Sequence, residues 1–407
     1  MSNDFSPSYQ YRSLTSLRLL VDAFDCGSIK DEFDRDLFNY FFILYRLHEH
    51  VDSSGFANIG AIEERLKADR VPWRMRVKLV VKALVNWFFL FCFKFFFLAV
   101  PKYKTRFVVK TWIDVNYSDF CRLTADDDHF VLVLPFPLGV NRQLRYLLDL
   151  YRKDVNFCIV GLPFRLSDIL RFARVPSFYN HFWCNHNASL GFSKLVNHQF
   201  LFQHYYTMDD VDPFNFSSNM ALKNQVGVTT ILHGIGTYSP ILSCDELYCF
   251  NQKQAEFYAC LNSEIKFVIL NEPALGAIDT CFTVSGILVF LSAITEASPS
   301  DEIRTEFKIL AKLKKICDNL QVDFYVKRHP NLINETLFKD HMLVSSIEDN
   351  VVVCSLYSTG YYTFGSNRSF LIDTGDFLLA DLFGEAERVI SEATLAEYLY
   401  DLFNQMD

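Results

Sequence analysis

Two clusters of polar residues, each following an apolar run, mark the last quarter of the chain. The run 324–326 leads into the cations and histidine of 327–330, and the run 351–354 leads toward the hydroxyls of Ser358 and Thr359. Apolar runs that end abruptly in polar residues are typical of buried parallel strands that deliver a site at their carboxyl ends. Cations, an imidazole and hydroxyls together hold phosphates, which indicates a nucleotide-activated donor and a transferase.

The first cluster reads Lys327-Arg328-His329-Pro330. His329 can donate a hydrogen bond to a phosphate oxygen, and Lys327 and Arg328 add positive charge. Because neighbouring residues of a strand face opposite sides, we expect one of the two cations to reach the site. Pro330 cannot continue a central strand, so it ends the run and fixes the turn.

The second cluster is the pair Ser358-Thr359, which stands where a helix could begin after the strand 351–354. The free N–H groups and the dipole at the start of a helix favour an anion, and the two hydroxyls add donors. An ordinary helix cap is the alternative interpretation of the same pair.

A third candidate is His233, which directly follows the apolar run 228–232. A histidine at the carboxyl end of a strand lies where open α/β sheets bind ligands. Its pKa range suits a general base that deprotonates an acceptor hydroxyl. A structural histidine in a tight turn is the alternative.

The acceptor is expected against the turns that follow strands of the first α/β domain. Gly234 and Gly236 let the turn after 228–232 approach a ligand closely. Pro137 and Gly139 follow the strand expected at 129–134, so their position predicts that they line the acceptor cleft.

This succession of His-Gly, His-Pro and Ser-Thr at strand ends resembles one group of GT-B glycosyltransferases. The group includes the CDP-glycerol glycerophosphotransferases of teichoic acid synthesis. It also includes bacterial transferases that use CMP-activated sialic acid or Kdo to build capsule and lipopolysaccharide. The likeness covers roughly residues 126–380, and the acidic pair of many bacterial sialyltransferases is missing before Gly234.

The resemblance implies a role for each cluster. In this group the His-Pro histidine and the Ser/Thr pair bind the nucleotide's phosphate, which implies that role for His329, Ser358 and Thr359. A His-Gly histidine is a proposed base in the glycerophosphotransferases, which implies that role for His233. The resemblance also implies catalysis without a metal ion or other cofactor.

The elements that must position these residues form an α/β pattern. Helices are expected over about 14–70, and strands alternate with helices from residue 126 onward. In the last third we expect strands at 287–291, 322–326, 351–354 and 370–372, and helices at 301–320 and 395–403. The predicted fold class is α/β of the GT-B type, with two Rossmann-like domains facing a cleft and a helical N-terminal extension. The expected regions are a helical segment at 1–125, an acceptor domain at 126–285 and a nucleotide-donor domain at 286–407.

Residues 70–106 form a basic and aromatic segment within the N-terminal region. Lys94 interrupts its longest apolar run, which is shorter than the roughly 20 apolar residues that span a membrane. We therefore expect an interfacial helix on a membrane surface. A buried core helix and a true span remain as alternatives.

Composition narrows the class of protein. The net charge of −9 argues against a nucleic-acid binder that works through bulk charge. The 11 cysteines form no C-x-x-C pair, so free thiols in a reducing cytosol are expected. The first residues lack the form of a secretion signal.

The sequence therefore predicts a metal-independent transferase with a cytidine-nucleotide donor. We expect it in the cytoplasm, peripheral at the inner face of the membrane, with a surface polysaccharide or a lipid-linked glycan as acceptor. One alternative is a GT-B enzyme that uses a UDP- or GDP-sugar, with Glu385 or Glu387 as the ribose-binding carboxylate. The other is a non-catalytic assembly protein of a polysaccharide complex.

Overall fold

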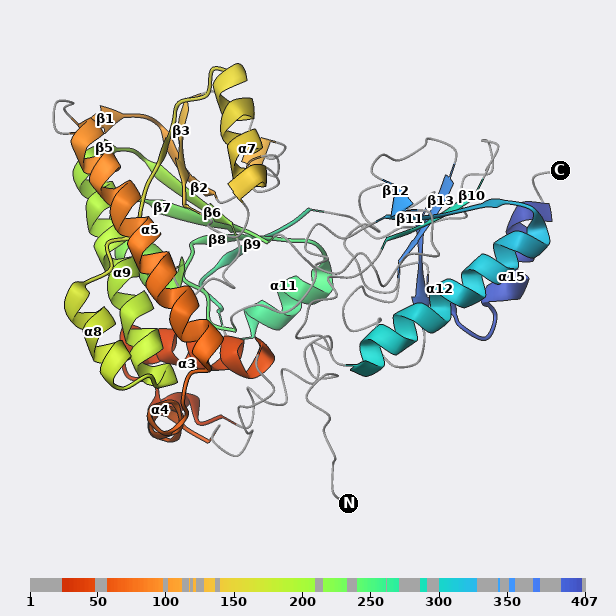
Figure 1. Cartoon of the computed structure of the whole chain (residues 1–407), viewed down its shortest axis with the longest axis horizontal. Coiled ribbons are helices and arrows are strands. Elements are labelled where there is room, and N and C mark those ends of the chain that lie inside the picture. The colour runs from red at the N-terminus through yellow and green to blue at the C-terminus, as the bar shows by residue number, and fades with distance from the viewer. Residues whose placement is uncertain are drawn as a thin grey trace.

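The computed structural model contains two α/β units that follow one another along the chain (Figure 1). The structure describes residues 24–47, 57–97, 102–111, 117, 120–121, 128–135, 140–208, 215–232, 240–260, 262–270, 286–290, 300–327, 343–344, 351–355, 369–373 and 389–404. Each unit is built on one large parallel sheet, so the predicted α/β class with two Rossmann-like sheets is confirmed.

The first sheet has seven strands in the order β4-β3-β2-β6-β7-β8-β9. Their bounds are β2 Phe107–Thr111, β3 His129–Val133, β4 Phe157–Ile159, β6 His204–Met208, β7 Gly227–Ile231, β8 Glu246–Cys249 and β9 Lys266–Ile269. The chain runs outward from β2 to β4 and then returns to the other side of β2 at β6. The strand order therefore reverses between β2 and β6, and open α/β sheets bind ligands at such a point. Two further short strands, β1 Tyr103–Lys104 and β5 Phe200–Leu201, pair with each other.

Helices cover both faces of this sheet. They are the 3-10 turn η1 Cys26–Ser28 and the α-helices α3 Glu32–Leu47, α4 Ile59–Ala68, α5 Trp73–Phe97, α7 Val140–Arg152, α8 Leu166–Arg174, α9 Phe178–Gln199, α10 Asn215–Lys223 and α11 Gln252–Ala259. Side-chain caps explain several of the helix starts. Asn58, Ser177 and Asn251 each accept a hydrogen bond from the backbone N–H three residues later, at the starts of α4, α9 and α11.

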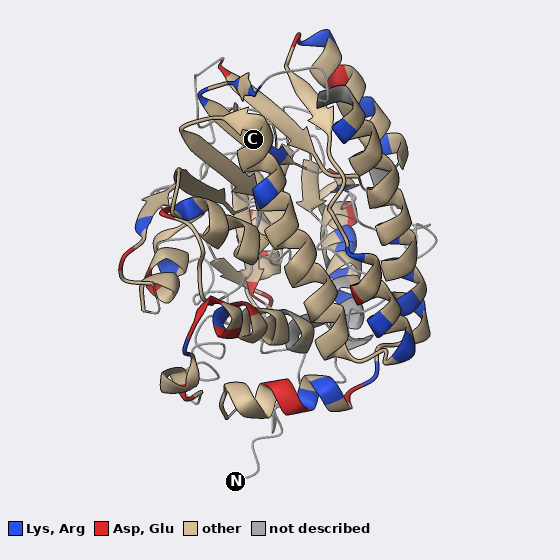
Figure 2. Cartoon of the chain, turned by 90° about the vertical axis from the view of Figure 1, so that its left-hand side faces the viewer, with Lys and Arg blue, Asp and Glu red and all other residues tan. Residues whose placement is uncertain are grey.

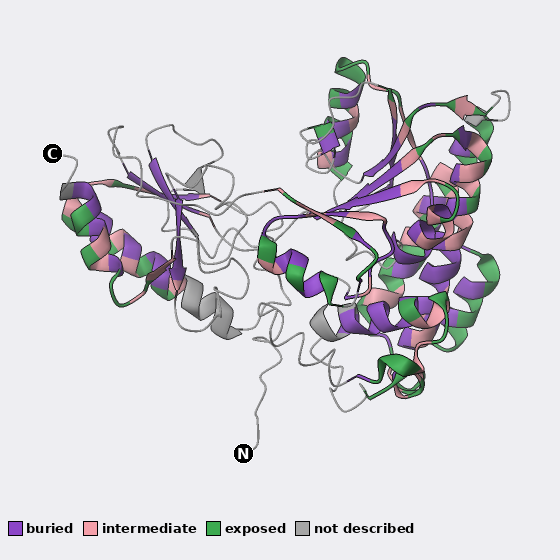
Figure 3. Ribbon diagram, turned by 180° about the vertical axis from the view of Figure 1, so that it is seen from behind, coloured by how far each residue is buried: buried purple, intermediate pink, exposed green. Residues whose placement is uncertain are grey.

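The core of the first unit lies on both faces of the sheet, as strand alternation requires. Val108 and Tyr205 belong to the larger core, which also takes in side chains of α3, α4, α5 and α9. Val109 and Tyr206 belong to a smaller core on the opposite face, where Tyr146 of α7 joins them. Figure 3 shows these strands as the buried centre of the unit.

The N-terminal region differs from the expected helical segment in one respect. Helices α3, α4 and α5 lie where helices are expected, but β2 at 107–111 is a central strand of the first sheet. Its run of β-branched residues is broken by Lys110, a residue that buried strands rarely contain, and basic residues precede it. Leu37 and Phe41 of α3 are buried in the larger core, so α3 is part of the first unit.

The second sheet has six strands in the order β12-β11-β10-β13-β14-β15. Their bounds are β10 Gly286–Phe290, β11 Asp323–Lys327, β12 Leu343–Val344, β13 Val351–Ser355, β14 Ser369–Asp373 and β15 Val389–Ser391, and the helices are α12 Ser300–Leu320 and α15 Leu395–Asn404. The four strands and two helices predicted here are confirmed to within one residue at each end. Val326, Val352 and Cys354 form the core with α12 and α15. All ten described cysteines of the chain are free thiols, as predicted.

Candidate functional site

The carboxyl edge of the second sheet carries the predicted phosphate site. In the parallel register, Phe290 of β10 is paired with Lys327 of β11 on one side and with Ser355 of β13 on the other. The ends of β11 and β13 are therefore level with each other at the same edge of the sheet. The strand order reverses between β10 and β13, so this edge is also a place where open α/β sheets bind ligands.

The two strand ends are not neighbours, however. Strand β10 lies between β11 and β13, although the two ends follow each other along the chain. Two strand spacings separate them by about 10 Å. Groups that follow the two strands can therefore meet at one anion only by reaching past the end of β10.

Lys327 is the member of the predicted donor site that the structure describes. Its neighbour Val326 is buried under α12 and α15. Lys327 therefore points to the opposite face of the sheet, which also carries Tyr325 and Phe290. It is half-buried, so its stem packs against the sheet while the ammonium can reach the edge.

The other predicted site residues lie outside the described residues. They are Pro137, Gly139, His233, Gly234, Gly236, Arg328, His329, Pro330, Ser358 and Thr359. The strands that lead to them are described: β3 and β7 in the first sheet, and β11 and β13 in the second. Their roles remain predictions.

At the carboxyl edge of the first sheet, a buried lysine ties the sheet to a helix. Lys110 is 1% exposed and donates a hydrogen bond from Nζ to Oδ1 of Asn215, the first residue of α10. Asn215 donates in turn to the carbonyl oxygen of Met208, at the end of β6. Because β2 and β6 flank the point where the strand order reverses, Lys110 fixes the start of α10 at the predicted acceptor side.

More buried polar groups lie beside Lys110. Val109 is paired with Tyr206, so Lys110 and Thr207 are the next residues along their strands, and Thr207 is paired with Thr230 of β7. The hydroxyls of Thr207 and Thr230 are buried and have no hydrogen-bond partner. The carboxyl half of this sheet therefore has a polar row on a face that is otherwise apolar.

Helix α7 is fixed at the same edge. Gln143 donates from Nε2 to the carbonyl oxygen of Leu134 at 2.6 Å. The hydroxyls of Thr111 and Tyr146 are 2.9 Å apart. These contacts hold α7 beside the end of β3, where the chain enters the segment predicted to line the acceptor cleft.

Asp36, His186 and Ser217 form a second buried polar cluster, which joins α3, α9 and α10. His186 Nδ1 lies 2.6 Å from Asp36 Oδ2 and 2.8 Å from Ser217 Oγ, and Ser217 also donates to Asp36. A hydrolase triad places its serine and its carboxylate on opposite ring nitrogens. Here both are at Nδ1, and the residues are at most 9% exposed, so the cluster joins three helices and has no triad geometry.

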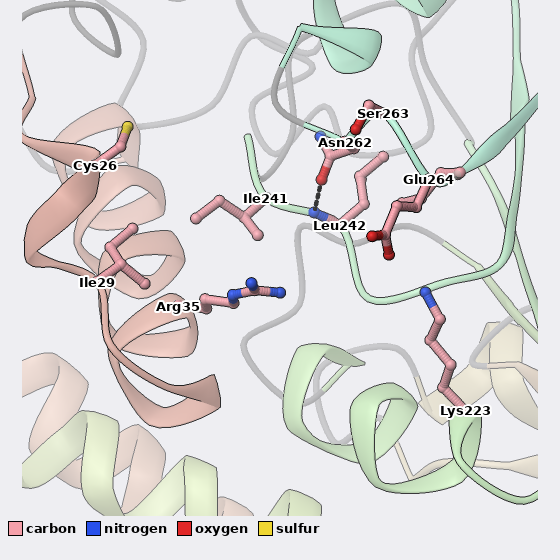
Figure 4. A pocket seen from close by; sticks show the side chains of 10 residues that line it. Cys26, Ile29, Arg35, Lys223, Ile241, Leu242, Asn262, Ser263 and Glu264 are labelled. Atoms are coloured by element: carbon pink, nitrogen blue, oxygen red, sulfur yellow. Dashed lines mark hydrogen bonds between the residues drawn. The ribbon is translucent and has the colours of Figure 1, made fainter.

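A pocket of ≈ 350 Å³ lies at the opposite, amino-terminal edge of the first sheet (Figure 4). Arg35 of α3, Lys223 at the end of α10 and Glu264 before β9 contribute its charged side chains. Lys223 already donates to the carbonyl oxygen of Cys244 and pairs with Asp245. Lys327, the predicted site residue that the structure describes, is not among the side chains that line this pocket.

Sequence reasoning missed Lys110 and Asn215. A lysine within a β-branched run was the available signal, because a charged residue in a buried strand must have a partner. Asn215 and Ser217 carry no such signal, because asparagine and serine at the start of a helix are ordinary caps.

No protein-family model matches the chain, and no curated protein matches it in sequence. Among solved structures, UDP-GlcNAc 2-epimerase from Methanocaldococcus jannaschii matches over 74% of this chain and 92% of its own, at 9% identity and a TM-score of 0.43. A structure of the enzyme from that organism in complex with UDP-GlcNAc and UDP matches over 74% and 93%, at 10% identity and a TM-score of 0.39. A ugt transferase from Siraitia grosvenorii in complex with UDP matches over 74% and 80%, at 10% identity and a TM-score of 0.31. With TM-scores under 0.5, these matches carry no argument about ligand or reaction.

Proposed function

We propose that the chain is a GT-B-like transferase that moves a sugar or a polyol phosphate from a cytidine-nucleotide donor to a glycan or lipid-linked acceptor. The observation that carries the proposal is the level arrangement of β11 and β13 at the carboxyl edge of the second sheet, on either side of β10. Lys327 stands at that edge and supplies positive charge for a phosphate. The sequence places His329 two residues after Lys327, and Ser358 and Thr359 shortly after β13.

In the proposed reaction, His233 takes the proton of the acceptor hydroxyl. The acceptor oxygen forms a bond to the reacting carbon or phosphorus of the donor, and the bond from that atom to the nucleotide's phosphate oxygen breaks. The departing phosphate keeps the electron pair. His329, Ser358 and Thr359 stabilise its charge, with Lys327 or Arg328 assisting, and no metal ion is required.

The acceptor side of the proposal rests on the first sheet. Strands β3 and β7 end at its carboxyl edge, directly before the turns that contain Pro137, Gly139, His233, Gly234 and Gly236. The proposed place of work is the cytoplasmic face of the membrane, where lipid-linked and membrane-tethered glycans are built.

A thermal-shift titration of the purified chain with CMP, CDP, UDP and GDP tests the donor. A product nucleotide that binds the folded state raises the melting temperature by mass action. We expect CMP or CDP to raise it and His329→Ala to abolish the rise. His198→Ala is the matched control, because His198 is an exposed histidine of α9 in the first unit, and this variant should keep the rise.

Each outcome decides one part of the proposal. A rise with UDP or GDP alone overturns the cytidine donor and leaves a nucleotide-dependent transferase. A rise that survives in His329→Ala overturns the assignment of the phosphate site. No rise with any nucleotide, together with no donor hydrolysis, favours the non-catalytic assembly protein.

A further inference from the structure

Helix α5 exposes an apolar stripe along nearly its whole length. Seven exposed apolar residues follow one another at steps of three or four: Trp73, Val77, Val80, Leu84, Phe88, Phe91 and Phe95. Such steps keep side chains on one face of an α-helix. Leu79, Ala83 and Phe93 are buried on the other side, in the larger core. Helix α5 is therefore apolar on both faces. One of these faces is exposed, and its residue Phe91 is 71% exposed.

The charges of α5 all have one sign. The helix contains Arg74, Arg76, Lys78, Lys82 and Lys94 and no acidic residue, although the whole chain has a net charge of −9. At 3.6 residues per turn, Arg74 borders the apolar stripe on one side, with Lys78 further round, and Arg76 and Lys94 border it on the other. Basic residues that border an apolar stripe suit the boundary between anionic headgroups and acyl chains.

Helix α8 adds a second apolar and basic face. Leu166 and Leu170 are exposed there, as is Val175 directly after the helix, and its exposed charged residues include Arg171 and Arg174. Its one acidic residue, Asp168, is buried and accepts a hydrogen bond from Asn187 of α9.

Both ends of α8 are tied to α5. Before α8, the carbonyl oxygen of Phe164 accepts a hydrogen bond from Trp87 Nε1 at 2.7 Å. After α8, the carbonyl oxygen of Pro176 accepts from the N–H of Val71 at 2.8 Å, just ahead of α5. Helix α8 therefore runs beside the first half of α5 in the opposite direction. The two helices lie on the same side of the first unit in Figure 1, and that side faces the viewer in Figure 2.

We propose that the exposed faces of α5 and α8 form one membrane-binding surface, the α5–α8 surface, which lies in the headgroup region of a bilayer that contains anionic lipids. The apolar residues would enter the boundary of the acyl chains, and the arginines and lysines would contact lipid phosphates. Among the described residues, no helix is long and apolar enough to cross a membrane, which favours a helix parallel to the surface. This surface is independent of the proposed transferase activity.

Vesicle co-sedimentation of the full chain tests the proposal without any donor or acceptor. We expect the chain to sediment with vesicles of phosphatidylcholine and phosphatidylglycerol, and much less with phosphatidylcholine alone. The combined variant Phe88→Ser, Phe91→Ser and Phe95→Ser should lower the partition coefficient at least about tenfold, because each lost ring removes apolar burial. Retained binding by this variant overturns the proposal.

The matched control is Leu144→Ser with Leu148→Ser in α7. Both leucines are 53% exposed, but α7 carries Asp149 in addition to its arginines. This variant should bind as the unchanged chain does, and an equal loss would mean that any exposed apolar residue suffices. Arg74→Glu with Lys78→Glu keeps the apolar stripe and should abolish the preference for anionic vesicles. If neither kind of vesicle binds the unchanged chain, a protein partner for this face replaces the membrane.

Discussion

His204 shows how packing around one side chain sets a pH dependence. Its Nε2 lies 2.6 Å from Thr229 Oγ1. The ring also lies against Gly227, where an added Cβ would come within 2.4 Å of Nδ1. Burial lowers the pKa of His204, and the nearby carboxylates of Glu246 and Asp245 oppose this shift only in part.

The lowered pKa of His204 predicts a loss of stability in mild acid. As pH falls below about 6.5, the unfolded chain takes up this proton before the folded chain does. The free energy of unfolding should therefore fall with pH until the lowered pKa is passed. Urea unfolding at several pH values between about 7.5 and 5 should show a smaller fall for His204→Gln than for the unchanged chain. His198→Gln, at an exposed position, should keep the full fall, and identical profiles for all three would contradict the argument.

Lys110 marks the limit of prediction at the residue scale. The polar strand ends at Lys327 and Ser355 could be located in advance because each follows an uninterrupted apolar run. The partnership of Lys110 with Asn215 joins residues 105 positions apart, and no local pattern predicts it. Only the tertiary fold, which brings the start of α10 beside the end of β2, joins the two.

Among the elements, predictability follows the strength of the local pattern. Strands β7, β10 and β13 are runs of apolar and β-branched residues, and the sequence places each of them within one residue or so. For helix α9 the sequence predicts no bounds. This helix carries asparagine, histidine and serine at buried positions such as Asn185 and Ser189, so it lacks one clean apolar face. Tertiary contacts with α3, α8 and α10 support it instead.

The packing of α5 on the first sheet depends on one glycine. An added Cβ at Gly161, just after β4, would lie 1.8 Å from the backbone oxygen of Asn86 in α5. Asn86 also accepts the N–H of Leu162 at 2.7 Å, so the helix cannot withdraw without losing this bond. Gly161→Ala should therefore lower the free energy of unfolding by about 1–3 kcal/mol, as overpacking does.

Chemical denaturation measures this change. The matched control is Gly60→Ala in α4, where the nearest atom to an added Cβ is a side-chain oxygen of Asn58 at 3.3 Å. Alanine is a better helix former than glycine, so this variant should be as stable as the unchanged chain or slightly more stable. Equal effects of the two substitutions on the free energy of unfolding would show that the packing of α5 does not require a glycine at position 161.

At the scale of the whole molecule, the proposed donor site and the α5–α8 surface belong to different units. The first surrounds β10, β11 and β13, and the second lies on helices that pack against the first sheet. The second unit has a core of its own with α12 and α15, although Leu371 of β14 belongs to the larger core of the first unit. Ligands of the two sites should therefore protect different segments of the chain from hydrogen exchange.

Hydrogen exchange followed by mass spectrometry can measure this protection peptide by peptide. CMP or CDP should slow exchange in peptides that contain 324–330 and 351–360 and leave the peptides of α5 and α8 unchanged. Anionic vesicles should do the reverse. Protection of α5 by a nucleotide alone would contradict the separation, because a soluble nucleotide has no contact there in either proposal.

Strand β10 sets the distance between the ends of β11 and β13, and so the size of the donor group that fits between them. The spacing of about 10 Å between the ends of β11 and β13 leaves room for both phosphate groups of a pyrophosphate donor, including the one that departs. If the proposed donor site is right, this spacing favours a polyol linked through CDP over a sugar linked through CMP. The larger melting shift should then come from CDP, a nucleoside diphosphate that keeps both phosphate groups, although transfer of a polyol phosphate itself releases CMP. Shortening the side chain at position 327 should weaken the binding of CMP more than that of CDP.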